Sequence, residues 1–172
     1  HKGTLQVDST VGQGSTFWVN LPIEEIAPPV ATPVNTPVIH DAEVRLLIVD
    51  DHLTNRLVAS AAILRCLPNA YIEQASNGNE ALEKMRLQRF DVVLMDLIMP
   101  DISGTEVVRR IRSDPGHPHP DVPVIALTAN VAEDAVKECL ALGFKEVLPK
   151  PFNRDVLVQT ILTYALPQHA AT

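Results

Sequence analysis

The sequence predicts an α/β fold of the (βα)5 type, in which five parallel strands and five helices alternate along residues 44–167 and form a doubly wound sheet. Two observations carry this prediction. Short apolar runs recur between longer amphipathic stretches, and the runs are continuously apolar, as expected of parallel strands covered by helices on both faces. Hydrophobic residues make up 46% of the chain and aromatic residues only 4%, so the core must be aliphatic.

The elements follow in order from these patterns. Strands are predicted at residues 45–49, 71–74, 91–95, 122–127 and 146–148. Helices are predicted at residues 55–67, 78–88, 104–112, 131–142 and 153–165. Ser103 can cap the third helix. Gly143 stands where the fourth helix should stop, because glycine readily adopts the left-handed conformation that ends helices.

Three further segments flank this domain. Residues 1–23 contain two β-prone runs, 4–7 and 16–21, around a glycine-containing turn, and they predict a hairpin in which Trp18 packs. Residues 24–43 carry four prolines without apolar periodicity and predict a linker, and residues 168–172 form a tail. Because the chain opens at His1 without a methionine, we expect it to be part of a longer protein.

The charge of the chain restricts its expected partners, and its cysteine content indicates its cellular setting. The chain has 21 acidic and 14 basic residues, so its formal charge of -7 disfavours nucleic acid or an anionic membrane as the main partner. No apolar stretch approaches the roughly 18 residues of a membrane helix. Cys66 and Cys139 lie in apolar helical patterns, which indicates reduced core thiols and a cytosolic setting.

Polar residues follow four of the predicted strands. They are Asp50, Asp51, Asp96, Thr128 and Lys150. Parallel strands place their carboxyl ends at one edge of a sheet, so these side chains should meet in one crevice, although an aspartate that ends a strand is usually a turn or cap residue. Clustered carboxylates favour Mg²⁺, and a lysine and a hydroxyl beside them suit a phosphoryl group. An aspartate there could act as a nucleophile and form an acyl phosphate.

Four motifs then resemble the response-regulator receiver family. They are Leu47-Ile-Val-Asp-Asp51, Val93-Leu-Met-Asp-Leu-Ile-Met-Pro100, Leu127-Thr-Ala129 and Leu148-Pro-Lys-Pro-Phe152. The resemblance covers residues 44–166. It implies a flavodoxin-like receiver fold with strand order 2-1-3-4-5.

The resemblance also implies roles for individual residues. Asp96 would be the phosphoacceptor, and Mg²⁺ would be held by Asp51, Asp96 and the backbone carbonyl of Ile98, with Asp50 assisting. Lys150 would pair with one phosphoryl oxygen and the Thr128 hydroxyl with another. The Lys150–Pro151 peptide would be cis.

Two segments point to a hybrid sensor histidine kinase as the parent protein. Asp51-His-Leu-Thr-Asn-Arg-Leu-Val58 resembles the first helix of receivers fused to such kinases, and residues 3–22 resemble the last strands of a kinase ATPase domain. The implied partners are a histidine kinase phosphodonor domain and a histidine phosphotransfer domain, which would receive the phosphoryl group in an onward relay. We expect a cytoplasmic fragment without an ATP site, from a parent that could be anchored in the inner membrane. Dimerisation stays open.

Several departures and alternatives bear on this interpretation. Val147 replaces the aromatic residue that the family usually places three residues before the lysine, which puts an aromatic switch in doubt. Phosphatases of the haloacid dehalogenase type use an Asp-x-Asp pair, and here Ile98 stands where the second aspartate would be. The general acid and base of that reaction is therefore missing, which disfavours a phosphatase. A docking module that is never phosphorylated, or a flavin-binding domain, would use the same fold. His117 and His119 are interpreted as loop residues rather than metal ligands. His52 lies beside the predicted acidic crevice and could tune its carboxylates, but it is interpreted as a solvent-facing residue because positions at the start of a helix are usually exposed.

Overall fold

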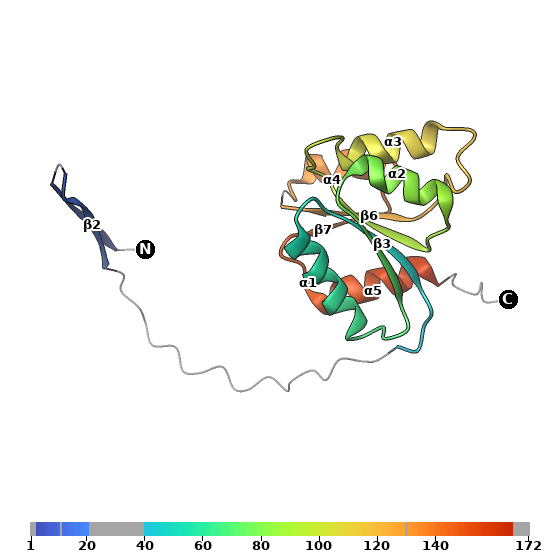
Figure 1. Cartoon of the computed structure of the whole chain (residues 1–172), viewed down its shortest axis with the longest axis horizontal. Helices are drawn as coiled ribbons and strands as arrows, with labels where there is room; N and C mark the ends of the chain where they lie inside the picture. Colours follow the sequence, from blue (N-terminus) through green and yellow to red (C-terminus); the bar gives the residue numbers. More distant parts are fainter. Residues whose placement is uncertain (1–2, 11, 21–39, 130, 167–172) are drawn as a thin grey trace. The chain divides into compact units, whose positions relative to one another are not determined.

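A computed structural model describes residues 3–10, 12–20, 40–129 and 131–166 (Figure 1). The chain divides into two compact units, residues 1–36 and residues 37–172, and each is described by itself. The boundary falls within the proline-rich stretch predicted as a linker, most of which lies outside the described residues, as does the predicted tail. In the part of the chain that is described, no helix has both the length and the apolar character needed to cross a membrane.

The first unit contains the predicted hairpin, with longer strands than expected. Strand β1 (Thr4–Thr10) pairs antiparallel with β2 (Gly14–Asn20). Leu5 lies opposite Val19 and Val7 opposite Phe17, so alternation brings these four apolar side chains to one face. All four are exposed, as is Trp18, which was expected to pack within the hairpin.

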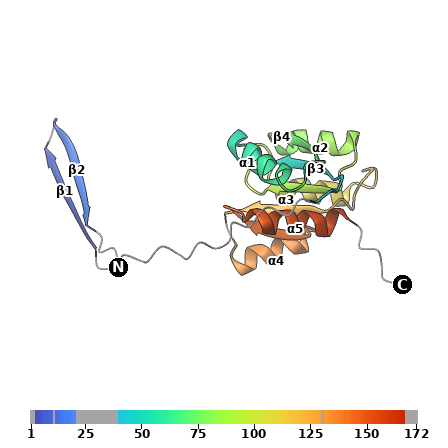
Figure 2. The same ribbon diagram turned by 90° about the horizontal axis from the view of Figure 1, so that it is seen from below.

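The second unit is built on a five-stranded parallel sheet (Figure 2). Its strands are β3 (Arg45–Val49), β4 (Tyr71–Ala75), β5 (Val92–Asp96), β6 (Val124–Thr128) and β7 (Glu146–Pro149). They are ordered β4-β3-β5-β6-β7, which confirms the predicted order 2-1-3-4-5. The three central strands are buried almost throughout, because helices cover both of their faces.

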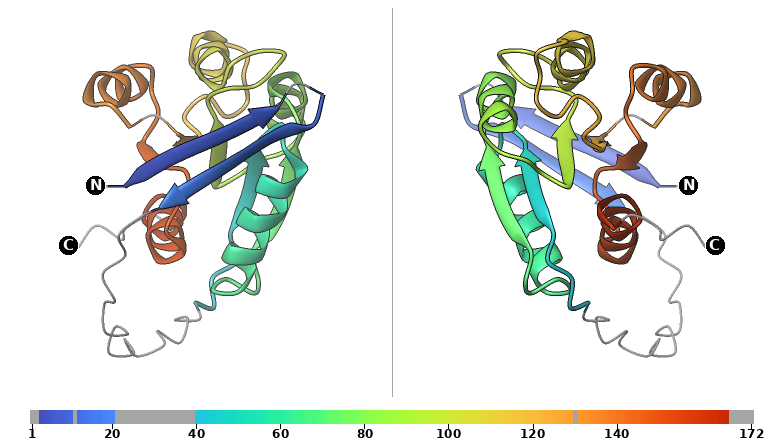
Figure 3. Two further views of the ribbon diagram at one scale, coloured as in Figure 1. Left: turned by 90° about the vertical axis from the view of Figure 1, so that its left-hand side faces the viewer. Right: turned by 90° about the vertical axis from the view of Figure 1, so that its right-hand side faces the viewer.

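Five helices cover the sheet, and their bounds are α1 (Leu53–Leu64), α2 (Gly78–Leu87), α3 (Gly104–Ser113), α4 (Glu133–Ala141) and α5 (Arg154–Ala165). Helices α1 and α5 lie on one face and α2, α3 and α4 on the other (Figure 3). Side chains of successive residues in β3 point to opposite faces of the sheet. Leu47 and Val49 pack in the core under α2 to α4, whereas Leu46 and Ile48 pack in the core under α1 and α5. Both cysteines are buried and free, as predicted.

Helix ends follow from local hydrogen bonds. Asn77, Ser103 and Asn153 cap α2, α3 and α5, because each side chain accepts a backbone N–H of the first turn. Gly143, with φ of 103°, follows the end of α4 as predicted. Helix α1 ends at Leu64 rather than residue 67, because the chain tightens into a turn in which the backbone N–H of Cys66 bonds the carbonyl of Ile63, only three residues back.

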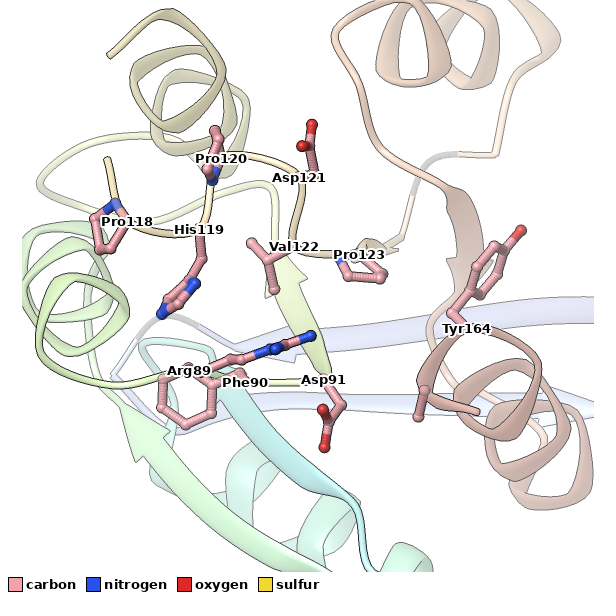
Figure 4. Close-up of a pocket in the computed structure, with 11 residues that line it drawn as sticks. Arg89, Phe90, Asp91, Pro118, His119, Pro120, Asp121, Val122, Pro123 and Tyr164 are labelled. Carbon is pink, nitrogen blue, oxygen red and sulfur yellow. The ribbon is translucent and has the colours of Figure 1, made fainter. Parts of the chain in front are cut away.

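Both ends of the described part of this unit lie at the amino edge of the sheet. The chain reaches β3 through His40, whose backbone N–H bonds the carbonyl of Cys66 at the end of the α1 region, and α5 runs back toward the same edge. A hollow of about 460 Å³ also lies there, lined by residues that precede β5 and β6 and by the last turn of α5, including Asp91, Val122 and Tyr164 (Figure 4). Residues at the carboxyl ends of the strands do not line it.

Candidate functional site

The carboxyl ends of four strands bring the predicted polar residues to one edge. Asp50 directly follows β3, Asp96 is the last residue of β5, Thr128 is the last residue of β6, and Lys150 directly follows β7. Asp50, Asp96 and Thr128 are all buried, with 2%, 8% and 4% exposure. Burial of two carboxylates is costly unless they are paired, so their partners define the site.

Lys150 joins the two buried carboxylates. Its Nζ donates to Asp50 Oδ2 at 2.6 Å and to Asp96 Oδ2 at 2.8 Å. Burial would lower the pKa of Lys150, but the hydrogen bonds and charges of the two carboxylates outweigh it and leave this pKa raised. The lysine is therefore held as a cation. The Lys150–Pro151 peptide is cis, as expected.

Asp50 is held by donors on several sides. Beside Lys150, its Oδ1 accepts the backbone N–H of His52 at 2.9 Å, and the amide of Asn55 donates to both oxygens at 3.0 and 3.1 Å. Burial would raise the pKa of Asp50, but these hydrogen bonds, led by that of Lys150, leave it lowered. Asp50 is thus an ionised, fixed carboxylate.

Asp51 has fewer partners. Its carboxylate is half-buried, and its one side-chain contact among the described residues is with His52, whose Nδ1 lies 2.6 Å from Asp51 Oδ1. The His52 ring is 72% exposed, as predicted, and it also contacts this acid, as the alternative interpretation of His52 allowed. The position of the Asp51 carboxylate therefore depends largely on its backbone.

These residues fit a hard divalent cation. The carboxylates of Asp50 and Asp96 contact the ammonium of Lys150, and Asp51 lies beside Asp50, so three acidic side chains and one lysine leave a formal charge of two negative units at the site. Ligand atoms of Asp50, Asp51 and His52 lie within 4.8 Å of one another. Carboxylate oxygens are the donors that Mg²⁺ prefers, and its charge would balance the excess.

The loop that follows β5 is held by hydrogen bonds to Asp96 at one end and to the start of α2 at the other. The backbone N–H of Ile98 donates to Asp96 Oδ1 at 3.2 Å, while the Ile98 side chain is 77% exposed. Asp101 accepts the backbone N–H groups of Gly78 and Asn79 at the start of α2, which favours its charged form and lowers its pKa despite the opposing effect of burial. This loop is therefore anchored to α2 beside the carboxylates.

Gly104 allows α3 to start directly against Asp96. A Cβ atom at this position would overlap the carbonyl oxygen of Asp96 and lie 2.8 Å from Met95 Cγ. The preceding Ser103 caps α3 through Glu106 N–H at 3.2 Å, as predicted. The close approach is therefore possible only without a side chain.

Several features around the site have no signal in the sequence. Asn55 and Arg56 belong to the motif of residues 51–58, but the motif alone does not predict that both contact the Asp50 region. His117 lies in a loop, as predicted, but its ring is buried at 5% exposure and its Nε2 has no hydrogen-bond partner among the described residues. Val147 is half-buried and packs against the core under α2 to α4.

A protein family and several known proteins match this chain. The family described as response regulator receiver domain matches residues 46–162. The chain is 32% identical over 159 residues to the sensor protein EvgS of Escherichia coli K12, covering 91% of this chain and 13% of that protein. It is also 32% identical over 160 residues to the aerobic respiration control sensor protein ArcB of Escherichia coli K12, covering 92% of this chain and 20% of that protein.

Solved structures show the same likeness. The receiver domain of the sensor histidine kinase PA1611 from Pseudomonas aeruginosa, solved with a magnesium ion in its active-site cleft, matches with a TM-score of 0.63 and 32% identity, covering 72% of this chain and 98% of that one. The chemotaxis response regulator CheY4 of Vibrio cholerae matches with a TM-score of 0.64 and 31% identity, covering 73% and 100%. The chain spans only about a fifth or less of the two sensor proteins it resembles.

Proposed function

Because the chain belongs to the response regulator receiver domain family, we propose that residues 44–167 accept a phosphoryl group on Asp96 and pass it on within a hybrid sensor kinase phosphorelay. One observation carries the proposal: Lys150 binds the carboxylates of Asp50 and Asp96 together at the carboxyl edge of the sheet. That arrangement places a fixed cation beside a buried nucleophile.

The proposed reaction uses these positions. A carboxylate oxygen of Asp96 attacks the phosphorus of a phosphohistidine, the phosphorus–nitrogen bond breaks, and its electron pair leaves with the imidazole. Lys150 pairs with a phosphoryl oxygen that becomes more negatively charged, and the Thr128 hydroxyl donates to another. The acyl phosphate formed on Asp96 can then be attacked by a second histidine, which completes the relay.

We further propose that Mg²⁺ is held by Asp51, Asp96 and the backbone carbonyl of Ile98, with Asp50 assisting. Bound there, the cation would neutralise charge on the phosphoryl oxygens during transfer. The two excess negative charges of the site support this assignment, as does the magnesium ion in the cleft of the similar Pseudomonas aeruginosa receiver.

The phosphodonor and the phosphotransfer domain are proposed to dock beside the site on α1. Its first two turns expose Leu53, Leu57 and Val58 at 58%, 54% and 55%. A hollow of about 390 Å³ lies next to Val58, is lined by Phe152 and reaches Lys150. An apolar helical partner that presents a histidine would cover this surface and bring its imidazole toward Asp96.

The flanking segments are assigned by the same proposal. The hairpin of β1 and β2 would be the end of a kinase ATPase domain, because its apolar face needs a covering layer that two strands cannot supply. Residues 24–43 would link that domain to the receiver, and both would lie in the cytoplasm.

Intact-mass measurement tests the proposal. The full chain is incubated with acetyl phosphate with and without Mg²⁺, and an Asp96→Asn variant is the control. We expect a single Mg²⁺-dependent phosphate that the control lacks. A folded chain that gains no phosphate in Mg²⁺ would contradict the proposal and favour a docking module that is never phosphorylated.

A further inference from the structure

Arg56 contacts the backbone that carries the acid pair. It lies in the first turn of α1, and its Nη1 donates to the carbonyl of Asp50 at 2.6 Å and reaches the carbonyl of Asp51 at 3.3 Å. The carboxylates of the same two residues bond other groups, namely Lys150, Asn55 and His52. Arg56 therefore acts on the main chain of the site and not on its ligand atoms.

The two carbonyls that Arg56 binds belong to the peptides on either side of the Asp51 Cα atom. The Asp50 carbonyl lies in the peptide before that Cα and the Asp51 carbonyl in the peptide after it. Holding both peptide planes fixes φ and ψ of Asp51, and these angles set the direction of its Cα–Cβ bond. A guanidinium is suited to this task because its donors have a rigid planar arrangement.

Arg56 is itself held in place by a ring of hydrogen bonds. Its Nε donates to Gln74 Oε1 at 3.3 Å, Gln74 Nε2 donates to Ser60 Oγ at 3.1 Å, and Ser60 Oγ donates to the Arg56 carbonyl at 2.8 Å. Lys84 Nζ also bonds the Gln74 carbonyl at 2.6 Å. The guanidinium is therefore ordered before any ligand arrives.

The Asp51 carboxylate has fewer partners of its own than the Asp50 carboxylate, so its position depends more on the backbone that Arg56 holds. Asp50 is fixed through its carboxylate by three groups, whereas the Asp51 carboxylate contacts only the exposed His52 ring among the described side chains. A carboxylate with few partners of its own depends on its backbone for its position before a metal binds. Groups that orient ligands in this way typically change metal affinity by about 10-fold to 100-fold when they are removed.

We propose that Arg56 is a positioning residue for the metal site, which orients the Asp51 carboxylate by holding the two peptides that flank it. This inference rests on the proposed function, because it takes Asp51 as a Mg²⁺ ligand. Gln74 and Ser60 serve the same purpose indirectly, by holding the guanidinium.

Mg²⁺ titration of the full chain by calorimetry tests the proposal. Arg56→Lys keeps the charge but loses the planar fork, so we expect its Kd for Mg²⁺ to rise about 10-fold. Arg65→Lys, at the exposed carboxyl end of the same helix, is the matched control and should leave Kd unchanged. Gln74→Leu should raise Kd about 3-fold, and its effect should largely vanish in the Arg56→Lys background.

Two further readouts separate positioning from general structural support. At saturating Mg²⁺, the rate of phosphorylation by acetyl phosphate should return to within about 3-fold of that of the unaltered chain, because only the affinity is impaired. Unfolding in urea measures stability in parallel. A lower unfolding free energy of Arg56→Lys with an unchanged Kd would overturn the proposal, as would additive effects of the two substitutions. Absence of Mg²⁺ binding by the unaltered chain would instead overturn the proposed function, and this inference with it.

Discussion

Replacing Lys150 with methionine gives the sharpest test of the site's electrostatics. The substitution keeps most of the side-chain length but removes the ammonium that lies 2.6 Å from Asp50 and 2.8 Å from Asp96. Asp50 is 2% exposed, so its carboxylate would stay buried after it lost its lysine partner. The carboxylates of Asp50, Asp51 and Asp96 would then have no lysine to balance their negative charge.

The magnitude follows from burial. Removing one partner of a fully buried ion pair costs about 3–5 kcal/mol, because the other charge is left uncompensated. Here the Lys150 side chain is 20% exposed, so water can replace part of the interaction. We therefore expect the unfolding free energy to fall by about 2–3 kcal/mol in the absence of metal.

Urea unfolding at neutral pH, with and without Mg²⁺, measures this change. Metal should stabilise the variant more than the unaltered chain, because its site is more negative, and a ligand at 100 times its Kd contributes about 2.7 kcal/mol. The loss should also diminish in acid. The lowered pKa of Asp50 stabilises the fold above the ordinary value of 3.8, and this stabilisation disappears as pH falls through the lower folded value. A change below about 0.5 kcal/mol in metal-free buffer would refute the reasoning.

Three other substitutions address separate features. Gly104→Ala should cost about 2 kcal/mol or more in urea unfolding and lower the yield of phosphorylation, because its methyl group would displace the backbone of Asp96; unchanged stability would contradict the close approach. Burial lowers the pKa of His117, so stability should decline as pH falls below about 6.5, and His117→Gln should remove this part of the slope in urea titrations across pH; an unaltered slope would count against it. Ile98→Asn should shorten the half-life of the acyl phosphate, measured by intact mass, because a polar side chain can orient the attacking water; an equal half-life would argue against this role.

Much of the fold could be predicted because its pattern is local. Continuous apolar runs indicate buried parallel strands, and the order of strands and helices then restricts the topology. The observed ends of helices and strands differ from the predicted ends by up to three residues, because local hydrogen bonds decide where an element stops. Strand β6 starts at Val124 rather than residue 122, because Pro123 lacks the N–H that a central strand would use.

The sequence also predicted that residues far apart along the chain come together in the site. Lys150 lies 100 residues from Asp50 in sequence, yet parallel strands must bring both to the same edge. Contacts made by side chains on the first turn of a helix were not predictable, because they depend on rotamers. The sequence therefore could not indicate that Arg56 turns toward two backbone carbonyls, or that the His117 ring is buried in its loop.

The amino edge of the sheet receives both ends of the described receiver unit, whereas the acidic residues occupy the opposite edge. A segment that joins the unit at His40 or at Leu166 therefore attaches at the edge of the sheet opposite Asp96. Under the proposed function, a different neighbour could then be joined at either end without altering the surface around Asp96 that a histidine would approach. The two ends of the described unit and the acidic residues are thus separated by the full length of the strands.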